Sequence, residues 1–327
     1  MSCLVPAVVT AAMLHAAPAL SQTALANPVA VIDKPATASQ NLNVQVNITY
    51  VGKNNGWAMV PFERHMGLIF FQAVINGEPA NVLLDNGFSH SVLSAEFARS
   101  IGVETEDLAM PFQTGTANAP VKLARGITLE IPHQLQSSTA MGVLDLAAMA
   151  GHLGRPVDAV LGGDLLGLMA LGIFNQNHRL AFVPSGAINP KAGAHSRQFP
   201  LINRDEVAAE LNGEPVRLQV DLGSNQAVSL SDKAWHRIFK DDSKALPSVT
   251  VRAEGAELPA RYLPDNRLAF SGFQAEGVPV VTSGPLPGDR EGLLGQAVLS
   301  KAEVVLDIPA KTMTFVRVEP ATPPAAP

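Results

Sequence analysis

The chain has 327 residues, of which 47% are hydrophobic and 16% charged, with a formal net charge of −6. This length allows one large domain or two modest ones with a well-filled core. The acidic balance and the lack of a long Lys/Arg cluster exclude a typical nucleic-acid-binding protein. The 26 glycines and 25 prolines are spread along the chain, which favours many short strands joined by turns.

Residues 1–26 are predicted to be a secretory signal peptide. Residues 4–20 are apolar, and Ala24-Leu25-Ala26 has the small-x-small pattern that signal peptidase prefers. A membrane anchor is the alternative, which two prolines and the shortness of the run disfavour. We therefore expect an exported protein, periplasmic or extracellular, with no stable membrane span once the signal is removed. The only cysteine, Cys3, lies in this segment, so we expect neither disulfides nor thiol chemistry.

Residues 27–59 are predicted to be a leader that contains a strand. Residues 43–51 alternate apolar and polar side chains, as a half-buried strand does. The sequence leaves open whether this leader is a pro-segment. At the other end, residues 319–327 form a Pro/Ala-rich tail that cannot pair as a strand.

The central part of the chain contains an internal repeat. Residues 76–87 read NGEPANVLLDNG, and residues 212–223 read NGEPVRLQVDLG, so the Asn-Gly pair and the Asp-x-Gly turn recur at the same spacing. Asn-Gly is a strong hairpin signal. Each copy is therefore predicted to be a strand, a tight turn and a second strand that ends on Asp-x-Gly.

A second block repeats further along the chain. Residues 157–162 (VDAVLG) and 290–295 (REGLLG) end on equivalent glycines, and each block is followed by two strand-like segments. Two matched blocks in the same order, at nearly the same spacing, indicate a tandem duplication. We expect one lobe at residues 60–190 and another at 196–318, joined by a short linker. Short helices are expected at 94–101, with Ser94 as N-cap, at 163–170 and at 232–239.

Each repeat places one carboxylate on a turn directly after an apolar strand. Gly87 and Gly223 allow the backbone to turn tightly behind Asp85 and Asp221. One such turn is usually only a turn, but two units related by a pseudo-twofold axis bring equivalent residues together near that axis. Two neighbouring carboxylates share one proton, which supplies a general base and a general acid that can activate water against a carbonyl.

These motifs resemble the pepsin/retropepsin-like aspartic proteases. That family has an apolar pair before Asp-Thr/Ser-Gly-Ala/Ser and, downstream, an apolar-apolar-Gly segment, which residues 160–162 and 293–295 match. The resemblance covers most of residues 66–318 in two copies. It implies an all-β fold of two tandem retropepsin-like (acid protease) barrel lobes related by a pseudo-twofold axis, with few short helices.

The resemblance also implies an activity. Asp85 and Asp221 would be the catalytic dyad of an endopeptidase that uses an activated water and needs neither cofactor nor metal. The substrate would be a peptide or protein, and the chain would be a monomer whose lobes form a pseudo-dimer. In the family a flap hairpin covers the cleft, and Gly115 and Gly255 occupy suitable places for it.

The sequence departs from the family pattern beside both aspartates. The family has Thr or Ser there, whose hydroxyl bonds across the lobe interface; here the residues are Asn86, which can still form such a bond, and Leu222, which cannot. The next family position is small. Ser224 fits it, whereas Phe88 is large and is expected to crowd the dyad or to fill part of the cleft.

Two other functions stay open at this point. One is a catalytically degenerate aspartic-protease-like module that binds an extended peptide as an added strand without cleaving it. The other is a structural or envelope-associated β-protein whose Asp-x-Gly turns are only turns. A serine-hydrolase elbow at Ser89 lacks its final Gly, and the histidine spacing fits no metal motif. Asp164 is expected to cap a short helix, and Asp307 to be a turn residue.

Overall fold

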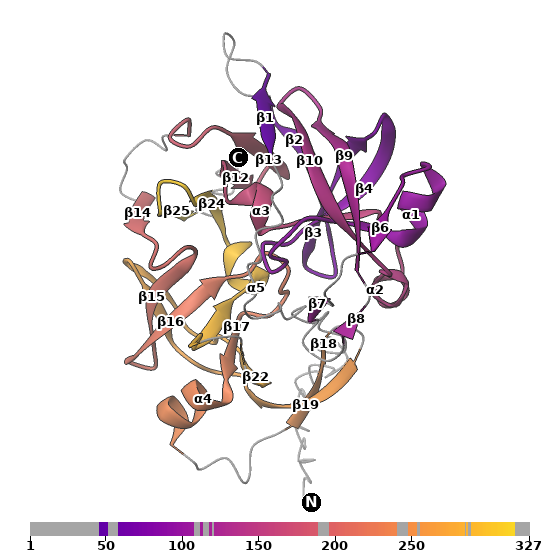
Figure 1. Cartoon of the computed structure of the whole chain (residues 1–327). Coiled ribbons are helices and arrows are strands. Elements are labelled where there is room, and N and C mark those ends of the chain that lie inside the picture. The colour runs from indigo at the N-terminus through magenta and orange to yellow at the C-terminus, as the bar shows by residue number, and fades with distance from the viewer. Residues whose placement is uncertain are drawn as a thin grey trace, which may run out of the picture.

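The computed structural model of the chain describes residues 46–51, 58–107, 112–113, 118–119, 121–188, 196–240, 248–253, 256–284, 286 and 289–317. The predicted signal peptide and tail lie outside these residues. The N-terminal half, coloured indigo to magenta, and the C-terminal half, coloured salmon to yellow, form two lobes that lie side by side (Figure 1). Among the described residues, no helix combines the length and apolar character that crossing a membrane requires.

Strands dominate the first half, where the described residues also form three short helices. In chain order the elements are β1 (Asn47–Tyr50), β2 (Val60–His65), β3 (Leu68–Ile75), β4 (Glu78–Leu84), β5 (Val92–Ser94), α1 (Ala95–Ser100), β6 (Glu106–Asp107), β7 (Phe112–Gln113), β8 (Asn118–Ala119), β9 (Lys122–Ile131), β10 (Leu135–Leu144), α2 (Ala147–Leu153), β11 (Ala159–Leu161), α3 (Gly163–Leu166), β12 (Ala170–Phe174) and β13 (Arg179–Val183).

The second half has the same character. Its elements are β14 (Ser196–Pro200), β15 (Glu206–Leu211), β16 (Glu214–Val220), β17 (Val228–Ser231), α4 (Asp232–Phe239), β18 (Ser248–Ala253), β19 (Ala256–Leu263), β20 (Leu268–Phe270), β21 (Phe273–Ala275), β22 (Val280–Gly284), β23 (Gly292–Leu294), α5 (Gln296–Leu299), β24 (Ala302–Asp307) and β25 (Thr312–Arg317). The all-β prediction with few short helices is confirmed.

The two halves repeat one sheet topology. Neighbouring strands in the first lobe follow the order β3-β4-β11-β5-β10-β9, and those in the second follow β15-β16-β23-β17-β22-β19. The pairings of β4 with β11 and of β5 with β10 are parallel, as are the equivalent pairings in the second lobe. The internal repeat seen in the sequence is therefore a repeat of the fold.

Each copy of the repeated strand order begins with the hairpin that its Asn-Gly pair predicts. Asn76 and Gly77 have φ values of 50° and 87°, and Asn212 and Gly213 have 54° and 86°. Two consecutive residues with positive φ form the turn whose twist matches that of paired strands. This turn joins β3 to β4 and β15 to β16, so both second strands end directly before an Asp-x-Gly sequence.

A central sheet joins the lobes in the order β14-β25-β24-β12-β13-β2. Its middle ladder pairs Leu171 with Leu306, Gly172 with Val305 and Ile173 with Val304. The spacing that relates Gly162 to Gly295 also relates Leu171 to Val304 and Ile173 to Leu306. If every residue of the ladder is replaced by its equivalent in the other half, the pair Leu171–Leu306 becomes the pair Val304–Ile173, which is also present. Such reciprocal pairing is the property of a twofold axis, here a pseudo-twofold axis between Gly172 and Val305.

Two of the three predicted helices match the structure closely. The side chain of Ser94 caps α1 by accepting a hydrogen bond from the Phe97 amide, and α4 spans Asp232–Phe239. The helix expected at 163–170 is wrong in its length, since α3 ends at Leu166 and Ala170 already belongs to β12. Of the predicted strand at 43–51, residues 43–45 lie outside the described residues, while Asn47–Tyr50 form β1, which pairs with β10.

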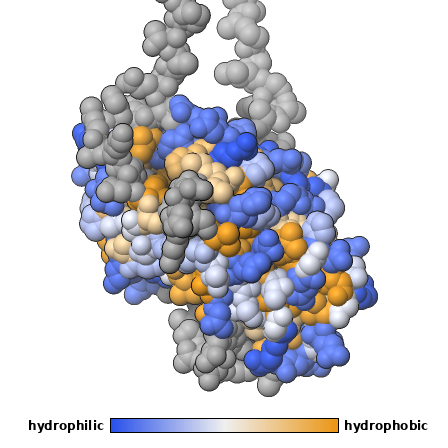
Figure 2. Space-filling model, turned by 90° about the horizontal axis from the view of Figure 1, so that it is seen from above, coloured by the Kyte–Doolittle hydropathy of each residue, from blue (hydrophilic) through white to orange (hydrophobic). Residues whose placement is uncertain are grey.

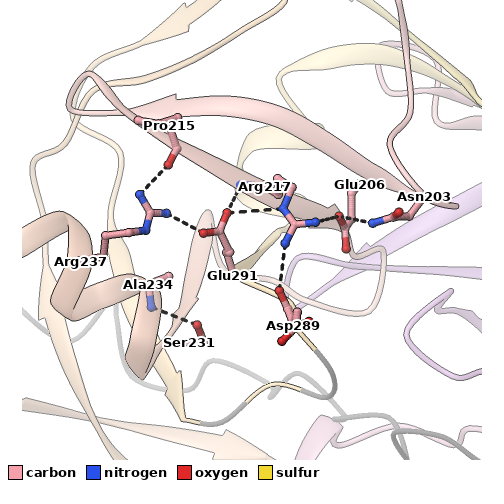
Figure 3. A network of polar contacts seen from close by, with 9 residues as sticks. All are labelled: Asn203, Glu206, Pro215, Arg217, Ser231, Ala234, Arg237, Asp289 and Glu291. Carbon is pink, nitrogen blue, oxygen red and sulfur yellow. Dashed lines mark hydrogen bonds and ion pairs between the residues drawn. The ribbon is translucent and has the colours of Figure 1, made fainter.

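A polar network ties α4 to the sheet of the second lobe (Figure 3). Glu291 accepts hydrogen bonds from the Arg217 amide at 2.9 Å and from the Arg237 side chain at 2.8 Å, and Arg217 also lies 3.6 Å from Glu206. In the first lobe the equivalent acceptor is Asp158, whose carboxylate binds the Asn81 amide. Equivalent acids thus bind equivalent backbone amides inside β4 and β16, and in the second lobe two arginine side chains join the network.

Most of the buried apolar residues form one large cluster that contains side chains of both lobes and the central sheet, and two smaller clusters lie beside it in the described residues. Large hydrophobic side chains that are exposed among the described residues are Val51, Met59 and Leu168. On the face shown in Figure 2, hydrophilic residues predominate and smaller apolar patches lie between them. The largest apolar cluster therefore spans both lobes.

Candidate active site

The two aspartate loops, residues 85–91 (the Asp85 loop) and 221–227 (the Asp221 loop), start from equivalent backbone contacts. The Asp85 amide donates to the Leu161 carbonyl at 3.1 Å, and the Asp221 amide donates to the Leu294 carbonyl at 2.9 Å. Leu161 and Leu294 end β11 and β23, the apolar strands that lie parallel to β4 and β16. The sheet thus fixes the backbone of each aspartate.

The glycine after each of these apolar strands lets it pack directly behind the loop. A Cβ on Gly162 would overlap the backbone of His90, and a Cβ on Gly295 would overlap the carbonyl oxygens of Gln226 and Ser224. A larger residue at either position would displace an aspartate loop. This contact explains why apolar-apolar-Gly occurs in both copies.

The turn glycines hold the two carboxylates in the same way. The Gly87 amide donates to Asp85 Oδ1 at 2.6 Å, and the Gly223 amide donates to Asp221 Oδ1 at 2.9 Å. Backbone N–H groups that bind a carboxylate favour its ionised form and orient it. Each aspartate side chain is therefore held by its own turn.

The structure brings the two carboxyl groups, which lie far apart in sequence, into one small site. A methyl group built on Gly87 would touch Asp85 Oδ1 and lie 3.4 Å from Asp221 Oδ1. A methyl group on Gly223 would overlap the Asp85 carboxyl group. Only 1% of Asp85 and 3% of Asp221 is exposed. The two buried acids thus meet over the turn glycines, one from each lobe.

Asn86 links the two loops across the lobe interface. Its Oδ1 accepts a hydrogen bond from the Leu222 amide at 2.8 Å, and its Nδ2 donates to the Val220 carbonyl at 2.7 Å. These two groups flank Asp221 on the opposite loop. Leu222 is fully buried in the apolar core, where its side chain can return no hydrogen bond. The side-chain link between the loops therefore comes from Asn86.

The residues that follow the turn glycines lie at equivalent places. The carbonyl of Phe88 accepts a hydrogen bond from the Gly163 amide, and that of Ser224 accepts one from the Gln296 amide, both at 2.7 Å. Ser224 is fully buried, while the half-buried Phe88 side chain packs with Met66 against an apolar cluster of the first lobe. The large residue at 88 therefore extends that cluster.

The two glycines assigned to flaps, Gly115 and Gly255, lie outside the described residues. The strands on either side of them pair in antiparallel fashion, β7 with β8 and β18 with β19. Paired strands therefore flank each position.

Two acids outside the pair have structural roles. The N-cap position of α3 is Gly162, and the Asp164 carboxylate accepts a hydrogen bond from the Leu165 amide in the first turn of this helix, as predicted. The same carboxylate also accepts hydrogen bonds from the Ser91 amide and hydroxyl. Burial raises the pKa of Asp164, against the smaller opposing effect of these hydrogen bonds. Asp307 ends β24, and its side chain holds the next turn through the Ala310 amide.

Several residues that support the loops gave no sequence signal. Arg64 donates at 3.1 Å to Gln296, whose own amide group donates to the Leu222 carbonyl at 3.0 Å. Burial lowers the pKa of Arg64 to about 10, so it stays charged at neutral pH. From the other lobe, Arg204 donates to the Gly163 carbonyl. Each lobe therefore sends an arginine to the short helix behind the opposite aspartate loop.

No group of three or more potential metal ligands occurs in the part of the chain that the structure describes. The chemistry that the site offers is that of two adjacent buried carboxyl groups held by backbone amides.

A family model described as aspartyl protease matches residues 71–165, which include the Asp85 loop. Among solved structures, the aspartic proteinase from Irpex lacteus is 12% identical, with a TM-score of 0.50 over 80% of this chain and 97% of that chain. Basic 7S globulin from soybean is also 12% identical, with a TM-score of 0.49 over 80% of this chain and 95% of that chain. A comparison with curated protein sequences finds no match.

The fold is that of the two-lobed aspartic proteinases. Together with the family-model match across the first aspartate loop, this fold makes the chain similar to the pepsin/retropepsin-like aspartic proteases.

Proposed function

We propose that the protein is an aspartic endopeptidase in which Asp85 and Asp221 form the catalytic pair. The observation that supports this most strongly is the meeting of the two carboxyl groups over Gly87, where one methyl group would touch both. Two carboxylates this close and this buried cannot both ionise cheaply, so one proton is shared between them. One group then acts as a base while the other acts as an acid.

In the proposed reaction a water molecule lies between the two carboxyl groups. The ionised carboxylate takes a proton from this water as its oxygen attacks the peptide carbonyl carbon, and the protonated partner gives its proton to the carbonyl oxygen. The resulting gem-diol collapses when the nitrogen accepts a proton and the C–N bond breaks, which leaves a carboxylic acid and an amine. The products carry the elements of one water and no other reagent is needed.

The residues that depart from the family pattern have contacts in the structure that are compatible with catalysis. Asn86 provides the link between the loops that a hydroxyl would otherwise provide, with hydrogen bonds to the residues on both sides of Asp221. Leu222 fills an apolar position, and the Phe88 side chain packs against the first-lobe cluster. These contacts favour the peptidase over the peptide-binding module that does not cleave.

The compartment and the substrate form part of the proposal. We infer export from the N-terminal sequence and a peptide or protein as substrate from the family. A peptide can lie in extended form against the flap positions, where the described strands are paired as hairpins. A single chain already contains both lobes of the site, which is consistent with a monomer.

The test is hydrolysis of a peptide library across acidic to neutral pH by the wild type and by Asp85→Ala and Asp221→Ala. We expect both variants to lose turnover while they retain the fold. Asp307→Ala is a matched control, because it also removes a buried acid but lies at a turn outside the site. Cleavage by Asp85→Ala at the wild-type rate would refute the proposal.

A further inference from the structure

A third buried acid contacts the link between the two loops. Asp205 is 8% exposed and lies in the turn before β15. Its Oδ2 accepts a hydrogen bond from Asn86 Nδ2 at 3.3 Å and another from Gln219 Nε2 at 3.0 Å. Gln219 is itself 2% exposed, so the cluster is closed off from solvent. A buried carboxylate needs such donors to offset its loss of hydration.

The contacts of Asn86 show what this acid does. The Nδ2 group has two N–H donors, of which one is bound by the Val220 carbonyl and the other by Asp205. The Oδ1 atom accepts from the Leu222 amide. With two acceptors on one side and a donor on the other, the side-chain amide has a single orientation that satisfies all three partners. Asp205 therefore fixes the amide that joins the loops.

Asn86 and Asp205, which are hydrogen-bonded to each other, both differ from their equivalents in the other copy of the repeat. The repeat that relates Asp85 to Asp221 aligns Asn86 with Leu222 and Asp205 with Ile69. Both Leu222 and Ile69 are fully buried apolar residues. At each of these positions one copy has a polar residue where the other has an apolar one, and the two polar residues bond to each other across the lobes. Asn86 and Asp205 form a matched pair.

The turn that carries Asp205 holds the Asp85 loop at a second point. The neighbouring Arg204 donates to the carbonyl of Gly163, whose amide in turn donates to the Phe88 carbonyl. A Cβ on Gly167, directly after α3, would overlap Arg204 Nη2, so this glycine leaves the room that the Arg204 side chain occupies. Two consecutive residues of the second lobe therefore support the Asp85 loop, Asp205 through Asn86 directly and Arg204 through Gly163, which binds Phe88.

We propose that Asp205 is a positioning residue: through the Asn86 amide it holds the Asp85 loop in register with the Asp221 loop. Its catalytic consequence rests on the proposed peptidase function. Because Asp205 is buried and acts through Asn86, it affects kcat and not the binding of substrate. Loss of the contact frees Asn86 to rotate and lets the two carboxylates shift relative to each other.

A double-mutant cycle of Asn86→Ala and Asp205→Ala tests this inference. We expect Asp205→Ala to lower kcat on the order of 10- to 100-fold, with KM little changed, as small misplacements of catalytic groups do. The same substitution should have no further effect on kcat in the Asn86→Ala background. Asp205→Asn keeps an oxygen acceptor and should recover most of the activity. Should Asp205→Ala fail to fold, Asp205→Ser, whose hydroxyl ends short of Asn86, replaces it.

Asp307→Ala is the matched control for lost stability. Asp307 is buried and accepts hydrogen bonds from Ser185, Gly186 and Ala310, far in sequence from both loops. We expect this variant to unfold more easily at unchanged kcat. A kcat that falls as much in Asp307→Ala as in Asp205→Ala would overturn the inference, and so would an unchanged kcat in Asp205→Ala.

The unfolding equilibrium gives a readout that does not depend on catalysis. If Asp205 holds Asn86, the two alanine substitutions are non-additive by at least about twofold in the unfolding equilibrium constant. Additive effects overturn the inference even if the enzyme is active. If the wild type cleaves no peptide, the proposed function fails, and this coupling still decides whether Asp205 holds Asn86.

Discussion

Replacing Gly223 by alanine tests directly whether the Asp85 carboxyl group lies where the structure places it. A Cβ on Gly223 would overlap three atoms of that carboxyl group, which belongs to the opposite lobe. The φ angle of Gly223 is not among the positive values of the chain, so alanine is not strained by its own backbone. The substitution therefore tests only whether the added methyl group overlaps the Asp85 carboxyl group.

The size of the effect follows from the contact. To regain an ordinary separation of about 3.5 Å, the Asp85 carboxyl must move by more than about 1 Å. A displacement of this size in a catalytic group lowers kcat on the order of 100-fold. Overpacking of a closed site costs about 1–3 kcal/mol of unfolding free energy. We therefore expect Gly223→Ala to be nearly inactive and moderately destabilised.

The assay combines kcat on a cleaved peptide with denaturant unfolding. Gly151→Ala is the matched control, since no atom lies within 4 Å of a Cβ at that position in α2. In a helix this change stabilises by roughly 0.5–1 kcal/mol and should leave kcat unaltered. If Gly223→Ala keeps both wild-type kcat and wild-type stability, Asp85 does not lie over Gly223.

Two further predictions concern stability. Burial raises the pKa of Asp164 above its ordinary value of 3.8, so the folded state retains this proton to higher pH than the unfolded state does. The unfolding free energy of the wild type should therefore fall as the pH rises from 3.8 through the pKa of Asp164 in the folded state, and Asp164→Asn should remove this loss. The measurement is the difference in unfolding free energy between wild type and variant across that pH range. A difference that does not change with pH contradicts the prediction. Ser231→Ala removes the cap that accepts from the Ala234 amide (Figure 3) and should cost about 1 kcal/mol in denaturant unfolding; an unchanged midpoint would show that the cap contributes nothing.

The sequence predicts the fold where the signal is local or repeated. The Asn-Gly pairs identify both hairpins because their backbone requires residues that tolerate positive φ. Ser94 marks a helix start because its hydroxyl replaces a missing backbone acceptor. The pairing of β12 with β24 has no such signal, since it joins apolar segments far apart in sequence whose register depends on the assembled lobes.

The residues of the candidate site can likewise be predicted from the sequence only where the signal is local or repeated. The repeat identifies Asp85 and Asp221 because duplication places equivalent residues near one axis. Asp205 escapes sequence reasoning because it lies in a turn that belongs to no motif, far along the chain from its partner Asn86. A signal does exist: the repeat aligns an aspartate with Ile69 and an asparagine with Leu222, and such a double mismatch marks residues that compensate each other.

The central claim is that one acid from each lobe acts on a shared water. A high-resolution crystal structure of the protein measures this most directly. We predict one solvent molecule within hydrogen-bond reach, about 2.6–3.2 Å, of a carboxyl oxygen of Asp85 and of one from Asp221. Carboxyl groups too far apart for any single solvent molecule to contact both would contradict the account.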